Sequence, residues 1–323
     1  MPGGATGFWC GQGTVLSRVG RLRGIVRGVT RRPLLQTLVL AVGPVLVLVL
    51  GVGCASAPVA LDVMSFNIRY ANPDDGDDFW ERRTELVFGV IRDHDPDVVG
   101  LQEALPGQMD ALRAAFPDYR FVGQGRGGGN RGEFSALMIR DARLDVVESG
   151  DFWLSPTPDE VGSQGWDASL PRMCTWAVLR DRRSAADILV MNTHFDHRGA
   201  EARRASAGVI LERRDRHAAL PTIVTGDLNA GEGSPPLVVF HAAGLRDTLR
   251  DAHPDATEVG TFNGFQGTSD GAKIDYVLVD DAWTTHAAAI VRDHTDGRYP
   301  SDHFAVLATV VLRPPTERAG ALR

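Results

Sequence analysis

The feature of this sequence that most constrains its fold is a series of short apolar runs, each five to nine residues long and rich in β-branched side chains. Runs of that length and composition are typical of buried β-strands, because helices need longer stretches with a different period. Eight such runs recur along the chain: Leu61–Ile68, Val98–Gln102, Ser135–Ile139, Arg172–Leu179, Ile188–His194, Thr222–Asp227, Asp275–Val279 and Phe304–Leu312. No linker rich in Ser, Gly or Pro divides residues 61–313, so we expect one domain.

Helical patterns lie between some of these runs. They cover Trp80–Asp93, Gln108–Ala115 and Glu201–Ala218, where apolar residues recur at the spacing of one helix face and polar residues occupy the other. The hydrophobic content of 43% allows a sizeable core. Strands and helices mixed in this way predict an α/β fold in which helices cover two packed sheets.

One of the apolar runs ends in Gly226-Asp227-Leu228-Asn229. Alternate residues of an extended chain point to the same face, so we expect the side chains of Asp227 and Asn229 to project together beyond the strand end. The alternative is a turn, because Gly, Asp and Asn all favour turns. This segment alone does not decide between the two interpretations.

The other strand ends also carry side chains that can bind metal or move protons. They are Asn67, Gln102-Glu103, the segment Asn192–His197, Asp275 and the segment Ser301–His303. Each of them has a simple explanation when taken alone, since strand ends meet water. Asn, Asp, Glu or His at six strand ends, with Asp227 included, favours one shared functional site.

The segment Gly123–Gly132 has the sequence GQGRGGGNRG. It lacks the Lys-Ser/Thr pair of a phosphate-binding P-loop. We interpret it as a flexible surface loop, with contact to a substrate as the alternative.

The distribution of charge limits the classes of function. The chain has 34 basic and 41 acidic residues, and the segment up to Leu61 contains six arginines and no acidic residue. The remainder is therefore more acidic than the whole chain. Avid binding to any nucleic acid needs a basic surface, so we expect no stable nucleic-acid partner, although a nuclease that carries its own metal ion stays open.

The first 57 residues have the pattern of an export signal. Arg31-Arg32-Pro33 resembles a twin-arginine motif, Leu34–Gly53 is apolar, and small residues surround Cys54, which is similar to the lipid-modified cysteine of a bacterial lipoprotein. We predict an exported protein, anchored at the cell surface or secreted. An uncleaved membrane anchor is the alternative, because roughly 20 apolar residues can span a bilayer. The expected division is 1–57 for the signal or anchor, 58–313 for the domain and 314–323 for a tail.

The motifs at the strand ends, in their order along the chain, resemble those of the endonuclease/exonuclease/phosphatase superfamily. This superfamily of metal-dependent phosphoesterases includes DNase I, abasic-site endonucleases, neutral sphingomyelinases and inositol polyphosphate 5-phosphatases. The motifs are Phe66-Asn67, Gln102-Glu103, Thr193-His194, Gly226-Asp227-Leu228-Asn229, Ile274-Asp275-Tyr276 and Ser301-Asp302-His303. The resemblance covers about residues 60–312. It implies a DNase I-like, four-layer αββα sandwich of two mixed, mainly antiparallel sheets flanked by helices.

The resemblance also implies a divalent metal ion. We expect Mg²⁺, with Mn²⁺ or Ca²⁺ as alternatives, because a hard cation neutralises an anionic phosphoester and prefers oxygen ligands. By family match, Glu103 supplies a carboxylate to the metal, and Asn67 and Asp302 are the further expected metal-binding residues.

The family match assigns catalytic roles to five further residues. Asp227 orients the attacking water, and Asn229 holds the phosphate or the nucleophile. His194 and His303 donate to phosphoryl oxygens as charge builds on them. Asp275 pairs with His303, since a carboxylate beside a histidine can hold it protonated and oriented.

Two residues keep alternative interpretations. Arg172 either contacts the substrate phosphate, as a guanidinium suits a planar anion, or is a structural ion-pair partner. Asp196 shares a strand face with His194, so it either supports the site or only ends the strand.

We therefore expect a phosphoric ester hydrolase that uses a metal ion and in-line attack of water on a phosphomonoester or phosphodiester. A secreted DNase-like nuclease is the alternative, and a non-catalytic surface lipoprotein that only binds a ligand is a further one. The expected partners are the phosphoester substrate and, through the N-terminal segment or a lipid, the membrane; we expect a monomer. Fold does not fix substrate, so phospholipid head groups, sugar phosphates and nucleic acid all stay open.

Overall fold

The computed structural model describes residues 59–314, which form two six-stranded sheets. The first sheet contains β1 (Ala60–Asn67), β2 (Val98–Gln102), β3 (Tyr119–Val122), β4 (Leu137–Arg140), β11 (Trp283–Val291) and β12 (Ala305–Leu312). The second contains β5 (Leu144–Trp153), β6 (Met173–Asp181), β7 (Asp187–His194), β8 (Thr222–Asp227), β9 (Arg246–Asp247) and β10 (Asp275–Val279).

The strand order is β11-β12-β1-β2-β4-β3 in the first sheet and β5-β6-β7-β8-β10-β9 in the second. Each sheet has one parallel pair at its centre, β1 with β2 and β7 with β8. The remaining pairs are antiparallel. The prediction of two mixed, mainly antiparallel sheets is confirmed.

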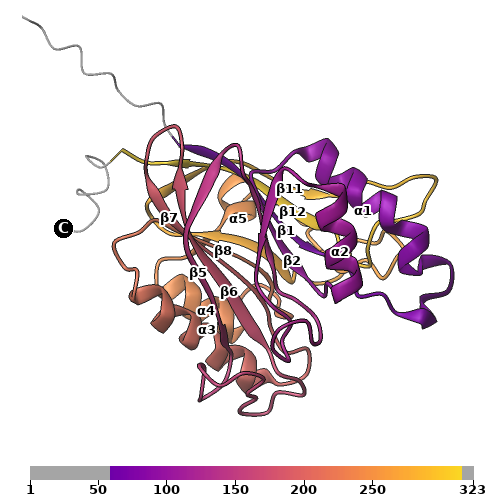
Figure 1. Ribbon diagram of the computed structural model, residues 1–323, viewed down its shortest axis with the longest axis horizontal. Helices are drawn as coiled ribbons and strands as arrows, with labels where there is room; N and C mark the ends of the chain where they lie inside the picture. Colours follow the sequence, from indigo (N-terminus) through magenta and orange to yellow (C-terminus); the bar gives the residue numbers. More distant parts are fainter. Residues whose placement is uncertain (1–58, 315–323) are drawn as a thin grey trace, which may run out of the picture. The chain divides into compact units, whose positions relative to one another are not determined.

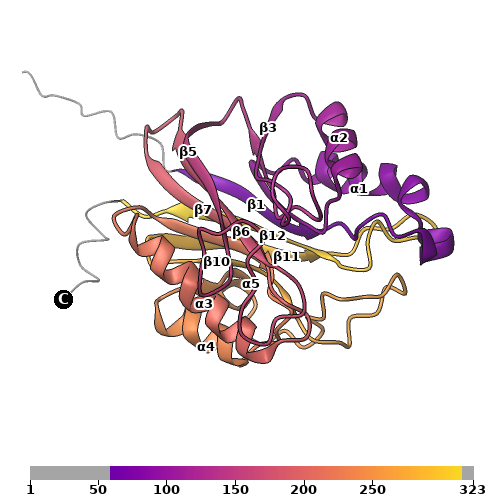
Figure 2. The same cartoon turned by 60° about the horizontal axis from the view of Figure 1, so that its bottom comes forward.

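Helices cover the outer faces of both sheets. The helical elements are η1 (Pro73–Asp78), α1 (Trp80–His94), α2 (Pro106–Ala115), α3 (Ala200–Asp215), α4 (Pro235–Ala242) and α5 (Thr248–Ala252). Figure 1 shows α1 and α2 on one side of the paired sheets and α3 and α4 on the other, and the view in Figure 2 agrees. The expected four-layer αββα sandwich is therefore confirmed.

Three groups of buried apolar residues fill the spaces between the four layers. Alternate residues of a strand face opposite sides, and β1 divides its side chains between two of these groups. Leu61 and Val63 belong to the group between the sheets, whereas Met64 and Phe66 pack with α1 and α2. The third group, which includes Phe240 of α4, lies between the second sheet and its helices.

Between the sheets, the inward side chains change from apolar to polar toward one end of the central strands. The series are Leu61, Val63, Ser65 and Asn67 in β1; Ile188, Val190, Asn192 and His194 in β7; Ile223, Thr225 and Asp227 in β8; and Val279, Val277 and Asp275 in the antiparallel β10. Strand register places Asp227 beside both His194 and Asp275. The strand alternation thus delivers the polar residues to one end of the sandwich.

Four strands of the described residues were not expected from the sequence: β3, β5, β9 and β11. Each of them is the outermost strand at one end of its sheet. An outermost strand has a neighbour on one side only, and β5 and β11 carry several exposed residues. Such strands lack the continuous apolar run by which the central strands were recognised.

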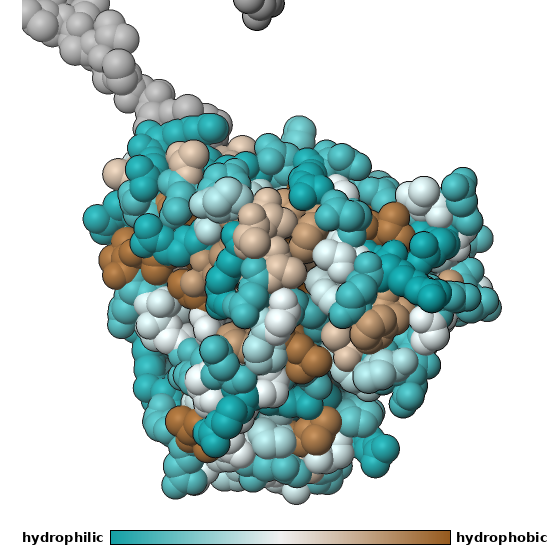
Figure 3. All heavy atoms as spheres, turned by 45° about the vertical axis from the view of Figure 1, so that its right-hand side comes forward, coloured by the Kyte–Doolittle hydropathy of each residue, from teal (hydrophilic) through white to brown (hydrophobic). Residues whose placement is uncertain are grey.

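The predicted export segment, Cys54 included, lies outside the described residues and stays a prediction. Among residues 59–314, the structure contains no helix that is both long enough and apolar enough to cross a membrane. On the face shown in Figure 3, hydrophilic residues predominate and hydrophobic residues occur in small scattered groups.

Candidate functional site

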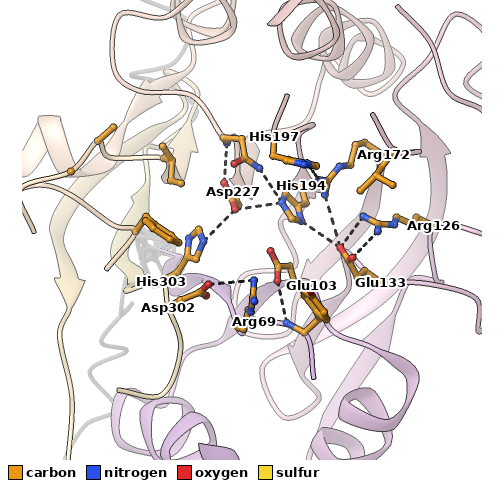
Figure 4. Close-up of a pocket in the computed structure, with 17 residues that line it drawn as sticks. Arg69, Glu103, Arg126, Glu133, Arg172, His194, His197, Asp227, Asp302 and His303 are labelled. Carbon is orange, nitrogen blue, oxygen red and sulfur yellow. Dashed lines mark hydrogen bonds and ion pairs between the residues drawn. The ribbon is translucent and has the colours of Figure 1, made fainter. Parts of the chain in front are cut away.

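The polar strand ends surround a cavity of about 870 Å³ (Figure 4). Seven of the nine predicted site residues line it: Glu103, Arg172, His194, Asp227, Asn229, Asp302 and His303. The other two, Asn67 and Asp275, are hydrogen-bonded directly to lining residues. The structure therefore brings all nine residues together.

Asn67, at the end of β1, connects two carboxylates of the cavity. Its Nδ2 donates to Oε1 of Glu103 at 3.2 Å and to Oδ2 of Asp227 at 2.9 Å. Its Oδ1 accepts from the backbone N–H of Arg69 at 3.0 Å. Because the amide oxygen is already engaged, this geometry favours a role for Asn67 in positioning the carboxylates over the expected role as a metal ligand.

Glu103 and Asp302 present carboxylates on the first-sheet side of the cavity. Glu103 follows β2 with φ of 64°, and its Oε2 accepts from the backbone N–H of Tyr70 at 3.1 Å. Oδ2 of Asp302 lies 3.6 Å from Nη1 of Arg69. Burial raises the pKa of Asp302, and the charge of Glu103 adds to this effect.

Asp227 and Asn229 meet in the cavity through a turn. Asn229 has φ of 46°, so the chain is not extended there. Its backbone N–H donates to Oδ1 of Asp227 at 2.9 Å, as in an Asx turn. The expected strand alternation thus ends at Asp227, and it is the turn that brings both side chains to the cavity.

His303 pairs with Asp275 as the family match implies. Its Nδ1 donates to Oδ2 of Asp275 at 2.9 Å, and both side chains are buried. Burial alone would lower the pKa of His303, but the charges of Asp275 and Asp227 outweigh it and raise that pKa well above its usual value. Nε2 of His303 lies 3.9 Å from Oδ2 of Asp227, so a protonated ring presents one N–H to the cavity.

His194 has the opposite electrostatic environment. Burial lowers its pKa well below the usual value, and the positive charges of Arg172 and Arg126 lower it further. Its Nε2 lies 3.1 Å from Nδ2 of Asn229, which donates to it, and 3.5 Å from Oδ2 of Asp227. The structure supports a protonated ring for His303 and a neutral ring for His194. The family match had implied that both histidines donate to phosphoryl oxygens.

Asp227 is the common neighbour of these groups. Burial, followed by the negative charge of Asp275, raises its pKa to about 7. The charge of His303 and the hydrogen bonds from Asn229 and Asn67 act in the opposite direction. A carboxyl group that titrates near neutral pH is suited to accept a proton from water.

The oxygen-rich set of side chains fits a hard divalent cation. Carboxylate oxygens of Glu103 and Asp227 and a ring nitrogen of His194 all lie within 4.8 Å of one another. Carboxylates gathered in a buried cavity repel one another, and a divalent cation relieves that repulsion. Of the predicted ligands, Glu103 and Asp302 are the ones that would hold the ion.

Arg172 lies on the cavity wall and also has ion-pair partners. Its Nη2 donates to Nδ1 of His197 at 3.2 Å. Its Nε is 3.8 Å from Oδ2 of Asp196, and its Nη1 is 4.0 Å from Oε2 of Glu133. Both interpretations of Arg172 therefore agree with its position.

Asp196 ends the strand and holds the following turn. Its carboxylate accepts from the backbone N–H groups of Ser169, Leu170, Arg198 and Gly199. Of these residues, only Leu170 lines the cavity. The structure thus favours the strand-ending interpretation of Asp196.

The glycine-rich segment Gly123–Gly132 contributes Arg126 to the cavity lining, which agrees with the alternative interpretation, contact with a substrate. The backbone N–H of Gly127 donates to the carbonyl of Arg131 at 2.8 Å, which closes the loop on itself. Arg126 donates to both oxygens of Glu133, at 2.6 and 2.8 Å. Arg126 and Glu133 both line the cavity.

Several other lining residues were missed by the sequence analysis. Arg69 and Tyr70 stand two and three residues after Asn67, and that proximity was the available signal. Phe262 is 49% exposed, and its ring lies edge-on to His303 with 5.2 Å between the centroids. Phe262 and Glu133 come from irregular segments, where periodicity carries no information.

A four-layer sandwich of two mixed six-stranded sheets, with a cavity at the end of its central strands, is the DNase I-like fold. The chain belongs to the Endonuclease/Exonuclease/phosphatase family, whose pattern its sequence matches over residues 64–303. The resemblance found in the motifs is confirmed.

Solved structures of related proteins agree with this assignment. An endonuclease/exonuclease/phosphatase family protein from Bacteroides thetaiotaomicron is 34% identical, with a TM-score of 0.76, covering 80% of this chain and 100% of its own. A protein of the same organism described as a mannosyl-6-phosphatase is 35% identical, with a TM-score of 0.74, covering 78% and 100%. The catalytic domain of human Nocturnin, at 19% identity and a TM-score of 0.64 over 79% and 94%, shares the fold.

Proposed function

We propose that this protein is a metal-dependent phosphoesterase that hydrolyses its substrate by in-line attack of water. The observation that carries the proposal is the position of Asp227, which lies between Asn67, His194 and His303 at the centre of the cavity. Its pKa of about 7 suits a group that accepts a proton near neutral pH.

The metal would be held by Glu103 and Asp302, with Asn67 fixing the orientation of Glu103. When bound, a divalent cation supplies positive charge that neutralises the phosphoryl group and polarises it toward attack. The expected ion is Mg²⁺, with Mn²⁺ or Ca²⁺ as alternatives.

Asp227 and the side chains around it have separate roles in the proposed reaction. Asp227 orients the attacking water and takes its proton, and Asn229 fixes Asp227 through the turn between them. His303, protonated beside Asp275, donates from Nε2 to the oxygens on which negative charge develops. Neutral His194 lines the opposite side and accepts from Nδ2 of Asn229.

Sugar phosphates are the first substrates to test among the open classes. The mannosyl-6-phosphatase of Bacteroides thetaiotaomicron is 35% identical and spans 78% of this chain. A DNase-like activity stays the alternative, and plasmid DNA belongs in the same panel.

The test uses the full chain, purified without metal, and a panel of sugar phosphates, bis-p-nitrophenyl phosphate, sphingomyelin and plasmid DNA. Turnover should require Mg²⁺ or Mn²⁺ and fall by about 100- to 10,000-fold in Asp227→Asn, which removes the base. Asp187→Asn, at the opposite end of the strand that carries His194, is the matched control and should keep full activity. A folded, metal-bound protein without turnover on the panel would favour the non-catalytic binding role instead.

We also propose, from the sequence of residues 1–57, that the protein is exported and attached to a membrane through this segment or a lipid on Cys54. Mass spectrometry of the membrane-bound protein should find a modified cysteine at its new N-terminus. An intact N-terminus would support the uncleaved anchor instead.

A further inference from the structure

Arg172 is a buried cation whose donors are only partly used. Its side chain is 6% exposed. Of its donor atoms, Nη2 bonds to His197, whereas Nε and Nη1 make no hydrogen bond to any atom of residues 59–314. Buried guanidinium groups normally hydrogen-bond through all their donor atoms. Arg172 lines the cavity, so its two unbonded donor atoms indicate a missing acceptor.

Two carboxylates lie at ion-pair distance from Arg172 but do not hydrogen-bond to it. The carboxylate of Glu133 is committed to Arg126 by two hydrogen bonds and lies 4.0 Å from Nη1 of Arg172. The carboxylate of Asp196, 3.8 Å from Nε, accepts from backbone N–H groups instead. Two donor atoms of Arg172 therefore stay without an acceptor on this wall, which we call the arginine wall (Arg126, Glu133, Arg172 and His197).

The arginine wall lies beside the reaction centre. Glu133 is 4.0 Å from both Nη1 of Arg172 and Nδ1 of His194, so Arg172 and His194 are neighbours. Figure 4 shows Arg172 and His303 on opposite sides of Asp227. A phosphoryl group placed at Asp227 would thus meet a cationic donor on each side.

We propose that Arg172, positioned by Glu133 and His197, binds a terminal oxygen of the phosphoryl group and makes the enzyme select phosphomonoesters over phosphodiesters. This inference rests on the proposed function. A monoester dianion has three terminal oxygens and two negative charges, whereas a diester has two terminal oxygens and one charge. His303, Arg172 and the metal site at Glu103 surround the cavity from three sides, which matches the three oxygens of a dianion.

The decisive comparison uses p-nitrophenyl phosphate and methyl p-nitrophenyl phosphate, which share a leaving group and differ by one methyl. At about pH 8 the monoester is a dianion, because its second pKa lies near 6. Wild type should prefer the monoester in kcat/KM. Arg172→Met should lower monoester kcat/KM by about 100-fold and diester kcat/KM by less than about threefold, since one charge-assisted contact is lost only with the dianion.

Two further variants separate charge from local structure. Arg172→Lys keeps the positive charge but lacks the paired N–H donors of a guanidinium group. It should retain part of the monoester preference that Arg172→Met loses. Arg198→Met is the matched control, because Arg198 is exposed, follows His197 and lies outside the cavity lining. Its monoester-to-diester ratio should equal that of wild type. Both esters are assayed with the same protein sample, so a lower amount of folded enzyme affects both kcat/KM values equally and does not change their ratio.

Glu133→Gln tests the positioning role. Loss of this carboxylate should weaken the monoester preference mainly through a higher KM, and Glu133→Asp should restore part of it. Equal losses for both esters in Arg172→Met, or a wild type that prefers the diester, would overturn the inference and leave the proposed hydrolysis intact.

A binding measurement makes the outcome independent of turnover. Calorimetry with orthophosphate and dimethyl phosphate should show tighter binding of orthophosphate to wild type and loss of that difference in Arg172→Met. If the full chain hydrolyses neither these esters nor any compound of the panel above yet shows this difference, the proposed function fails and the anion site stands. If orthophosphate binds wild type and variant equally, the anion site fails.

Discussion

At Asp227, burial and two neighbouring charges act on a single carboxyl group. Asp275 raises its pKa and His303 lowers it, and Asp275 also holds His303 protonated. The titrations of Asp227 and His303 are therefore linked through Asp275, which is hydrogen-bonded to His303 and lies beside Asp227 in the strand register. Because Asp275 acts on both groups in the same direction, its removal has a defined effect on the pH dependence of activity.

Asp275→Asn is expected to move both limbs of the pH–activity profile to lower pH. Loss of the negative charge lowers the pKa of Asp227. The acid limb, along which activity rises as Asp227 loses its proton, therefore moves to lower pH. Loss of that charge also lowers the pKa of His303. The alkaline limb, along which activity falls as His303 loses its proton, therefore moves to lower pH by about 1–3 pH units. The measurement is kcat/KM against pH. Asp280→Asn, just beyond the other end of β10, is the control, and an unshifted alkaline limb would show that Asp275 does not act through His303.

Glu103→Gln is expected to weaken metal binding because it removes one negative charge and keeps the shape of the side chain. The Mg²⁺ concentration for half-maximal activity should rise by about 10- to 100-fold. The rise of Tm that Mg²⁺ gives to wild type should shrink in parallel. Glu85→Gln, on the exposed face of α1, serves as the control. The same Mg²⁺ dependence in both variants would remove Glu103 from the metal site.

At the scale of elements, one arginine of α1 joins the loops that carry the site. Arg83 is fully buried and donates to backbone carbonyls of three separate segments of the chain. The acceptors are the carbonyls of Ile68, Arg69, Tyr70, Asp78 and Pro300. Helix α1 therefore fixes the segment after β1 and the segment before β12, which carry Arg69 and Asp302.

Arg83→Met is expected to lower the free energy of unfolding by about 3–5 kcal/mol, because several buried carbonyls lose their donor. Arg82→Met, on the next position of the same helix, removes an exposed pair with Asp77 and should cost less than about 1 kcal/mol. Chemical denaturation measures both values. Similar values for the two variants would contradict the role of Arg83 as the link between the loops.

The elements also show what the sequence could predict. The central strands were recognised with small errors at their ends. Strands such as β2 and β8 are buried on both faces and therefore have continuous apolar sequences. The outermost strands β3, β5, β9 and β11 were not recognised. The segment Gly123–Gly132 has no periodicity, so its place at the cavity could not be derived from its composition.

At the scale of the whole molecule, a buried polar network joins the two sheets next to the site. Asn192 of β7 donates from Nδ2 to the carbonyls of Leu101 and Ala136, on the opposite sheet. Its Oδ1 accepts from Nε2 of Gln102 at 2.7 Å and from Oγ1 of Thr225 at 3.0 Å. These bonds set how closely the sheets approach where the cavity begins.

Gly100→Ala tests this packing. A methyl group at Gly100 of β2 would collide with Oγ1 of Thr225 and Oδ1 of Asn192 on the facing sheet. The expected cost is about 1–3 kcal/mol in the free energy of unfolding, with reduced activity because the sheets move apart at the site. Gly89→Ala, inside α1 with open space around it, should be neutral or stabilising by up to about 1 kcal/mol. A neutral Gly100→Ala would show that the sheets are not closely packed there.

The sequence by itself determined the central strands, the helices α1, α2 and α3 and the identity of the polar residues at the strand ends. Those features follow from local chemistry: the period of side chains along a strand, β-branching, and polar groups where a strand stops. Tertiary structure alone decided that Arg126 and Glu133 join Arg172 at the cavity, and that His303 is protonated while His194 is neutral. Both outcomes depend on burial and on charges from distant parts of the chain, which no local pattern contains.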